Sequence, residues 1–180
     1  FNLAYCYFTG NGVRENKKRA TYYFTEAAEA GDKDAMIFLA EVFAGTGGVE
    51  QDLQTSFEWW KAAAEAGAEE AYYNLGKCYE NGKGTNVDMR KALEWYLRAA
   101  KAGNCYAMND VGIYFANGYA CEVDEEEAFK WFKKAAVNED YAEAMYNLAT
   151  CYENGIGTEE NAEEAIRLKF LALKLEQKDS

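Results

Sequence analysis

A repeat of 36 residues runs through this chain and limits the folds open to it. Three Ala-rich runs, AAEAG, AAEAG and AAKAG, end at Gly31, Gly67 and Gly103, and a fourth run, AAVNE, places Glu139 at the equivalent position. A fixed period of roughly 20 to 50 residues is typical of repeat architectures. In such proteins each unit buries its apolar face against its neighbours, so stability comes from stacking. The repeat therefore predicts a solenoid.

Two further landmarks keep the same register. A small residue lies near the start of a helical pattern at Ala35, Ala71, Ala107 and Ala144. An aromatic residue recurs in every unit, at Tyr7, Phe43, Tyr79, Phe115 and Tyr152. One inserted residue near Tyr141 explains the shift in the last unit, and the register runs from one end of the chain to the other.

Each unit contains two helical patterns separated by a glycine-containing loop. In the first helix, apolar residues follow the spacing i, i+4, i+7, i+8 of an amphipathic helix, as in Ala71, Leu75, Cys78 and Tyr79. In the loop ENGKGTNVD, Gly82 and Gly84 permit positive φ angles and end this helix. Asp88 is expected to cap a second helix over residues 89–101, whose apolar residues again share one face.

Composition agrees with an all-α fold. The 180 residues include no proline, and 49% of them are hydrophobic, which provides for long helices and a substantial core. We expect residues 1–180 to form a single array of about five antiparallel helix pairs, the first of them shortened at its N-terminus.

The unit from Ala71 to Gly103, AYYNLGKCYENGKGTNVDMRKALEWYLRAAKAG, resembles the Sel-one-like repeat, a relative of the tetratricopeptide repeat with a longer glycine loop. The resemblance covers nearly the whole chain. Departures are Thr46 and Ala120, each in place of a loop glycine, and Ser56 in place of an alanine. Some secreted members join each helix pair by a disulfide, but the matching residues here include Ala64 and Ala100, so the resemblance implies no disulfides.

The resemblance implies a right-handed α-solenoid whose concave surface is lined by the first helices of the pairs. Members of the family are adaptors in signalling, in membrane-associated assembly complexes and in bacterial contacts with hosts. The implied function is a protein–protein interaction scaffold that binds a peptide or a partner domain in the concave groove.

Charge restricts the partners. Lys and Arg number 19 against 31 Asp and Glu, a net charge of −12, which repels nucleic acids and anionic membrane surfaces. A basic or neutral protein or peptide fits better. The chain contains no apolar stretch of about 18 residues, so we expect no membrane insertion.

The five cysteines predict neither a metal site nor a disulfide framework, because they show no CxxC spacing and the chain has no histidine. We expect no cofactor. Cys6, Cys78 and Cys151 share one repeat position and are interpreted as core residues. Unpaired cysteines favour the cytoplasm, but Phe1 begins in mid-helix, so a preceding export signal remains open.

Catalysis is not predicted. Without histidine, neither a Cys-His nor a Ser-His arrangement can form. The loop sequences GKG and GIG lack the GxxxxGK[ST] pattern of a phosphate-binding loop. The run from Asp124 to Glu127 lies at the start of a second helix, where acidic residues complement the helix dipole, and is interpreted as a cap.

A candidate binding surface follows from the tetratricopeptide resemblance, because such proteins often hold peptides with an asparagine directly before the leucine of the first helix. The amide of such an asparagine can both donate to and accept from a peptide backbone. The candidate residues are these asparagines, the aspartate in their register and their neighbours: Asn2, Tyr5, Glu41, Tyr73, Asn74, Lys77, Asp110, Tyr146 and Asn147. The alternatives are a solvated polar face for the asparagines and packing between repeats for the tyrosines.

Two further features leave other contacts open. Trp60 is an additional aromatic beside Trp59, about 100° further round the helix, and could face a groove or a neighbouring chain. Phe1 and Leu3 belong to a first helix with no helix before it, whereas the tail KLEQKDS is polar like a cap. Head-to-tail stacking into an oligomer or filament is therefore the alternative function.

Overall fold

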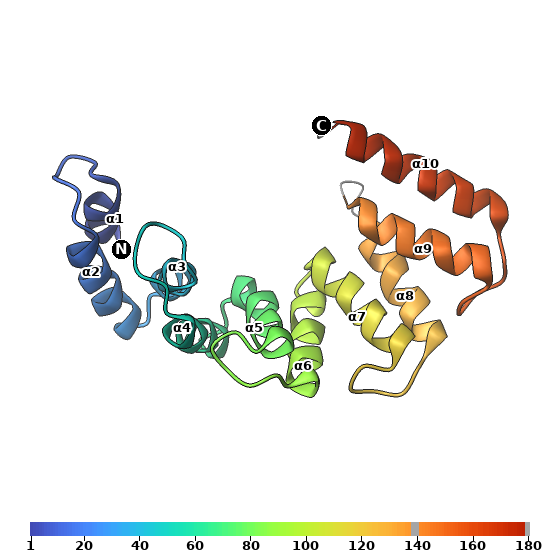
Figure 1. Cartoon of the computed structure of the whole chain (residues 1–180), viewed down its shortest axis with the longest axis horizontal. Coiled ribbons are helices and arrows are strands. Elements are labelled where there is room, and N and C mark those ends of the chain that lie inside the picture. The colour runs from blue at the N-terminus through green and yellow to red at the C-terminus, as the bar shows by residue number, and fades with distance from the viewer. Residues whose placement is uncertain (138–140, 179–180) are drawn as a thin grey trace. The chain divides into compact units, whose positions relative to one another are not determined.

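The structure, a computed structural model, describes residues 1–137 and 141–178 and is helical throughout its regular elements (Figure 1). The described residues form ten α-helices and no strand: α1 Asn2–Thr9, α2 Lys17–Glu29, α3 Lys33–Phe43, α4 Leu53–Glu65, α5 Glu69–Asn81, α6 Met89–Lys101, α7 Cys105–Asn117, α8 Glu125–Ala135, α9 Ala142–Asn154 and α10 Ala162–Lys178. Glu139 and the last two residues of the tail lie outside the described residues. The all-α prediction is confirmed.

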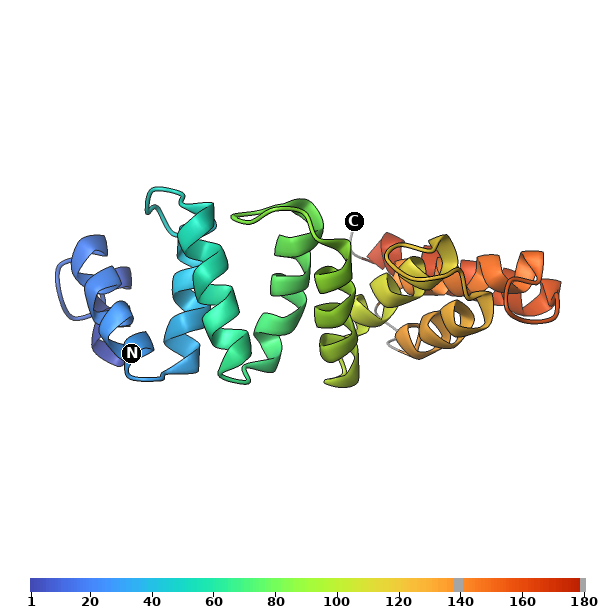
Figure 2. The same cartoon turned by 90° about the horizontal axis from the view of Figure 1, so that it is seen from below.

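The chain divides into two compact units. The first runs from Phe1 to Asp88 and contains α1 to α5, and the second begins at Met89 and contains α6 to α10. In the first unit each helix packs against the next one along the chain, as Figure 2 shows for α1 to α5. In the second unit α6 to α10 pack in the same sequential way. Sequential packing of this kind is the contact pattern of a helical solenoid.

Helix boundaries follow the capping signals in the sequence. The observed α5 contains the amphipathic pattern Ala71–Tyr79, and α6 has the bounds that its apolar pattern predicts. Gly82 ends α5 in the left-handed conformation with φ 66°, and Gly84 has φ 72°, as predicted. At the start of α8, Asp124 accepts a hydrogen bond from the backbone N–H of Glu127, which confirms that the acidic run is a cap.

The glycine loop inside one helix pair lies against the start of the second helix of the preceding pair. In the first unit, the α3–α4 loop and the loop that follows α5 lie at one edge, opposite the shorter α2–α3 and α4–α5 turns (Figure 2). Gly84 lies against the backbone at Leu53, the first residue of α4. In the second unit, Gly157 lies in the same way against Glu125, the first residue of α8. Both contacts leave no room for a side chain.

One loop position departs from glycine. Ala120 has φ 60° and is the one non-glycine residue with a positive φ in the described part of the chain. It stands 36 residues after Gly84, where the loop requires the left-handed conformation. The sequence resemblance identifies this departure, and the structure shows that the alanine adopts the strained conformation instead of altering the loop.

Aromatic residues of the second helices fill the interior of each unit. The most deeply buried series repeats every 36 residues and consists of Phe24, Trp60, Tyr96 and Phe132. The interpretation of Trp60 as an additional aromatic beside the packing residue Trp59 is therefore wrong. Trp60 is only 6% exposed and belongs to the core series, whereas Trp59 is less buried. The sequence pair WW cannot show which ring points inward, because that depends on how the helix is rotated against its neighbours.

The cysteines behave as core or partly buried residues. All five thiols are free of disulfide bonds. Cys78 and Cys151 are buried, as expected, whereas Cys6 is only partly buried. Burial raises the pKa of both Cys78 and Cys151 to about 11, so these thiols remain protonated at neutral pH.

Candidate functional site

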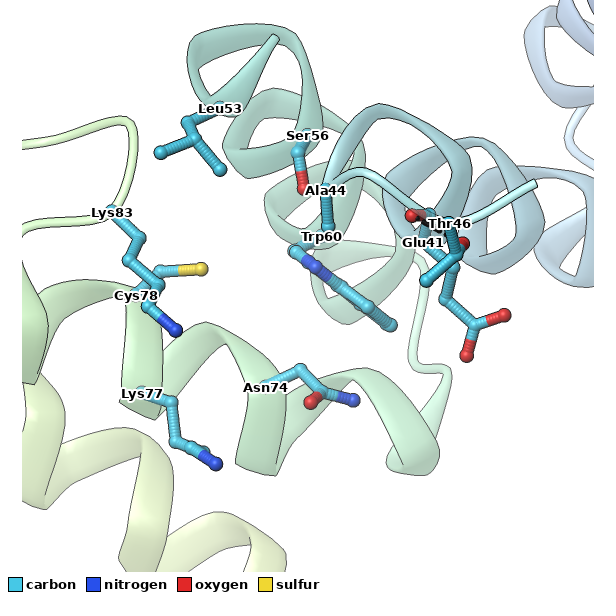
Figure 3. A pocket seen from close by; sticks show the side chains of 10 residues that line it. All are labelled: Glu41, Ala44, Thr46, Leu53, Ser56, Trp60, Asn74, Lys77, Cys78 and Lys83. Carbon is cyan, nitrogen blue, oxygen red and sulfur yellow. Dashed lines mark hydrogen bonds between the residues drawn. The ribbon is translucent and has the colours of Figure 1, made fainter. Parts of the chain in front are cut away.

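A cavity of about 410 Å³ opens in the first unit between α3, α4 and α5 (Figure 3). We call it the Trp60 pocket. Its wall consists of ten residues from these helices, the α3–α4 loop and the loop after α5: Glu41, Ala44, Thr46, Leu53, Ser56, Trp60, Asn74, Lys77, Cys78 and Lys83. The volume lies within the range of roughly 300 to 1,000 Å³ that is usual for ligand pockets.

Three of the residues selected from the sequence meet in this pocket. Glu41 comes from α3, whereas Asn74 and Lys77 come from successive turns of α5. The 36-residue register that equates Glu41 with Lys77 thus places both at one cavity, because α4 packs between α3 and α5. The prediction that these side chains lie together is consistent with the geometry, but their binding role stays a prediction.

The centre of the pocket is aromatic and rigid. The ring of Trp60 lies between the side chains of α3 and those of α5 in Figure 3. Ser56, one turn earlier on α4, is buried and its Oγ donates a hydrogen bond of 2.7 Å to the carbonyl oxygen of Ala40. This bond joins α4 to α3 directly behind the pocket. Trp60 is therefore held by core packing while part of its ring remains accessible to a ligand.

Charges of opposite sign occupy opposite sides of the pocket. In Figure 3 the side chains of Lys77 and Lys83 extend on one side and Glu41 on the other, with Trp60 between them. The Asn74 side chain lies along the same wall as Lys77. Its amide nitrogen makes only a long hydrogen bond of 3.4 Å to the carbonyl oxygen of Glu70 on its own helix. The amide can therefore exchange this bond for one to a ligand.

Tyr73 lies beside the pocket and not in its wall. The Lys77 ammonium is 5.5 Å from the centre of the Tyr73 ring, a distance at which a cation–π attraction operates. Tyr73 is half-buried, and its role in binding or in packing between repeats stays a prediction.

Asn2 and Tyr5 lie elsewhere in the first unit, on the short helix α1. Both side chains are exposed. Tyr5 joins an aromatic group around Phe38, with 6.3 Å between the two ring centres, and Phe1 lies 6.3 Å from the same ring. Tyr5 thus belongs to a separate aromatic group, and neither Tyr5 nor Asn2 lines the Trp60 pocket.

The remaining three candidates belong to the second unit, where Asn147 has a structural partner. Its Nδ2 donates a hydrogen bond of 2.8 Å to Oδ1 of Asn109, which is fully buried, and Asn109 donates in turn to Glu143 at 3.4 Å. The amide of Asn147 therefore satisfies a buried acceptor. One amide N–H of Asn147 is thus engaged within the protein, and its binding role stays a prediction.

Tyr146 and Asp110 lie near this network in sequence. The Tyr146 hydroxyl donates to Glu176 on α10 at 3.3 Å. Desolvation, and then the charge of Glu176, raises the pKa of Tyr146. Asp110 is half-buried on α7.

Two residues of these sites were not predicted from the sequence, and each has an identifiable reason. Asn109 stands 36 residues after Tyr73, at a position where the other units carry larger side chains, and this polar exception in an apolar register was an available signal. Lys83 lies in a loop, 36 residues after Gly47, and only the closure of the loop onto α4 brings it to the pocket. No periodic pattern marks it.

The described residues contain no group of three or more His, Cys, Asp or Glu side chains that could hold a metal ion. In that same part of the chain, no helix combines the length and apolarity needed to cross a membrane. The thiol in the pocket, Cys78, has a raised pKa and no histidine to activate it, so it is a poor nucleophile.

Helix pairs at a constant period, each packed against the next within its unit, define a helical repeat protein. The chain belongs to the Sel1 repeat family, whose model matches residues 1–32, 33–67, 69–104, 105–136 and 142–168. Proteins with this repeat generally mediate protein–protein interaction, and the family is a family of non-catalytic scaffolds. A comparison with curated proteins finds no match.

Several solved structures share the fold. A Sel1 repeat protein from Oxalobacter formigenes is 28% identical with a TM-score of 0.83, and the match covers 96% of this chain and 68% of that one. The protective antigen c5321 of uropathogenic Escherichia coli is 27% identical with a TM-score of 0.87, covering 96% and 37%. Cysteine rich protein B of Helicobacter pylori is 26% identical with a TM-score of 0.52, covering 71% and 92%. The chain thus spans little more than a third of the length of c5321.

Proposed function

We propose that this protein is a scaffold that binds a segment of a partner protein, and that the Trp60 pocket anchors this segment. The observation that carries the proposal is the meeting of Glu41, Asn74 and Lys77 around the accessible part of Trp60. Binding energy at protein interfaces concentrates in a few residues, among which tryptophan is enriched. A core tryptophan with its ring at the base of a cavity provides such an anchor without a large entropy cost, because its rotamer is already fixed.

The partner contacts extend beyond the pocket in this proposal. Tyr73 and the exposed Tyr5 and Asn2 provide additional surface in the first unit, and Asp110, Tyr146 and Asn147 provide it in the second. Because one amide N–H of Asn147 already donates to Asn109, its contribution to a partner is limited to the second N–H and the side-chain oxygen. The net charge of −12 favours a partner that is basic or neutral over most of its surface.

No catalysis is part of the proposed function. The pocket contains no pair of groups in which one could activate the other as a nucleophile. The five thiols without disulfide bonds support a reducing compartment such as the cytoplasm.

The proposal can be tested by photo-crosslinking. A benzophenone amino acid replaces Glu41 at the pocket or, as the control, Lys18, which is exposed on α2. We expect a cross-linked partner from position 41 that is absent from position 18 and is lost when Asn74→Ala and Lys77→Ala are added. Circular dichroism must show unchanged helicity in the variants. Equal cross-linking from both positions would refute the pocket as the anchoring site.

Self-association is a second candidate function, because apolar side chains are exposed on α1 and α10. On α10, Ile166, Phe170 and Leu173 are 69%, 57% and 48% exposed and form a stripe at i, i+4 and i+7. On α1, Leu3 is 52% exposed. Light scattering over a concentration series decides between the candidates. Growth in mass that Phe170→Glu abolishes would support head-to-tail association, whereas a constant monomer mass would contradict it.

A further inference from the structure

The local charge of the Trp60 pocket is opposite to that of the whole chain. Acidic residues outnumber basic ones by 31 to 19 overall, yet the pocket wall carries two lysines and one glutamate. Lys77 and Lys83 both lie on the side formed by α5 and the loop that follows it, away from Glu41 (Figure 3). An excess of positive charge in an acidic protein indicates a ligand group of negative charge.

Both lysines carry their charge on the α5 side of the pocket. Burial is the largest effect on the pKa of the Cys78 thiol and raises it, whereas the charges of Lys83 and Lys77 lower it. In Figure 3 the Lys83 side chain lies beside this thiol, and the Lys77 side chain extends away from it on the Asn74 side. Two cations on one side of a cavity can each pair with an oxygen of one carboxylate.

Neither lysine is neutralised by a side chain of the protein. None of the ion pairs within the described ranges, 1–137 and 141–178, includes Lys77 or Lys83. The one acidic residue of the pocket wall, Glu41, takes part in none of these ion pairs either. Both lysines are exposed, so a carboxylate that pairs with their ammonium groups breaks no ion pair of the protein.

We infer that the Trp60 pocket takes an acidic side chain of the partner segment, whose carboxylate is held by Lys77 and Lys83 while an apolar neighbour contacts Trp60. This inference rests on the proposed function and names the chemistry of the group that enters the pocket. The Asn74 amide lies on the same wall and can donate a third hydrogen bond to the carboxylate.

The acidic surroundings do not prevent such binding. At physiological ionic strength the screening length is about 8 Å, so the distant carboxylates contribute little at the pocket. Glu41, on the opposite side, repels a carboxylate from its own end of the cavity and attracts a basic or amide group there. The pocket therefore orients the segment, with its acidic residue towards α5. A partner segment that is basic outside its one acidic residue complements both the two lysines of the pocket and the negative net charge of the whole chain.

The test uses the full chain and three pools of nine-residue peptides that are random except for a fixed central residue. This residue is glutamate, glutamine or phosphoserine. Retention of the protein on each immobilised pool is measured for the wild type and for the Lys77→Gln, Lys83→Gln variant. A control variant, Lys18→Gln, Lys101→Gln, changes the net charge equally at exposed sites outside the pocket.

We expect the glutamate pool to retain the wild type about fivefold more than the glutamine pool, since two partly exposed ion pairs contribute modestly. The ratio of retention on the glutamate pool to retention on the glutamine pool should fall to about one in the Lys77→Gln, Lys83→Gln variant and stay at about five in the control. Raising the salt concentration should weaken it.

Other outcomes overturn the inference. If the glutamate and glutamine pools retain the wild type equally, or if no pool retains it, the pocket recognises no carboxylate. If the phosphoserine pool retains it more strongly than the glutamate pool, the pocket is assigned to phosphate. If the control variant loses the preference for the glutamate pool to the same extent, the preference is a general effect of net charge. Retention that is the same for every central residue, but is lost in the Leu53→Ala variant, would leave the proposed function standing and overturn only the carboxylate assignment. Leu53 is an exposed residue of the pocket wall.

Discussion

Replacing Gly84 by alanine should destabilise the first unit far more than the same change at Gly12. The two glycines occupy equivalent loop positions with nearly the same φ, 72° and 73°. A left-handed alanine costs about 1–2 kcal/mol. About 0.4–1 kcal/mol of this is offset, because alanine restricts the unfolded chain more than glycine does. Gly12→Ala, whose Cβ would meet no atom within 4 Å, should therefore cost about 0.5–1 kcal/mol.

At Gly84 a steric cost is added. A Cβ there would overlap the backbone of Leu53 and lie 2.8 Å from Cβ of Phe57, so α4 itself would have to move. Overpacking of this kind costs about 1–3 kcal/mol. The total for Gly84→Ala is about 2–4 kcal/mol, and it should also weaken ligand binding, because Leu53 and Lys83 line the Trp60 pocket.

Thermal unfolding followed by circular dichroism measures the difference. For a chain of this size, 1 kcal/mol corresponds to about 2–4 °C in Tm, so Gly84→Ala should lower Tm by about 9 °C and Gly12→Ala by about 2 °C. Gly157→Ala offers the same comparison in the second unit, where a Cβ would lie 2.8 Å from the backbone nitrogen of Glu126. Equal losses at Gly12 and Gly84 would refute the close approach of this loop to α4.

Three further predictions concern individual side chains. Ala120→Gly relieves the strain of φ 60° and should raise the free energy of unfolding by about 0.5–1 kcal/mol in a urea titration; a loss of stability would show that the alanine side chain is needed. Asn147→Ala leaves Oδ1 of the buried Asn109 without its donor and should cost about 1–3 kcal/mol, whereas Asn74→Ala should cost less than about 0.5 kcal/mol; similar values for both would argue against the buried network. Burial raises the pKa of the Cys78 thiol from 9.0 to about 11, so between these pH values the folded state holds a proton that the unfolded state releases. Stability should therefore fall as pH rises from 9 towards 11, and Cys78→Ala should reduce this fall; an unchanged pH profile in the variant would exclude the thiol as its source.

Most of the fold could be predicted because its determinants are local. The period of 36 residues, the apolar spacing from Ala71 to Tyr79 and the glycines after it correspond to observed helices and loops. Capping and helical amphipathicity act within a few residues, so a single sequence contains them.

The candidate site could be predicted only in part. Glu41, Asn74 and Lys77 do line one pocket, whereas Asn147 makes an internal hydrogen bond and Tyr5 joins an aromatic group around Phe38 of α3. Equivalence in a repeat places residues on equivalent faces, but it does not make their surroundings equivalent. The neighbour across the interface differs from unit to unit, and the neighbour decides whether a side chain is buried, bonded or free to bind.

The sequence by itself determined that the chain is an all-α repeat protein of the Sel1 family, that one helix runs from Met89 to Lys101, and that Gly82 and Gly84 take positive φ angles in the loop before it. The tertiary structure alone decided that Trp60 and not Trp59 points inward, that Asn109 and Asn147 bond across 38 residues, and that Lys83 joins the pocket. Hydrogen-bonding and capping patterns repeat along the chain, whereas the rotation of a helix and the closure of a loop depend on side chains packed from other units.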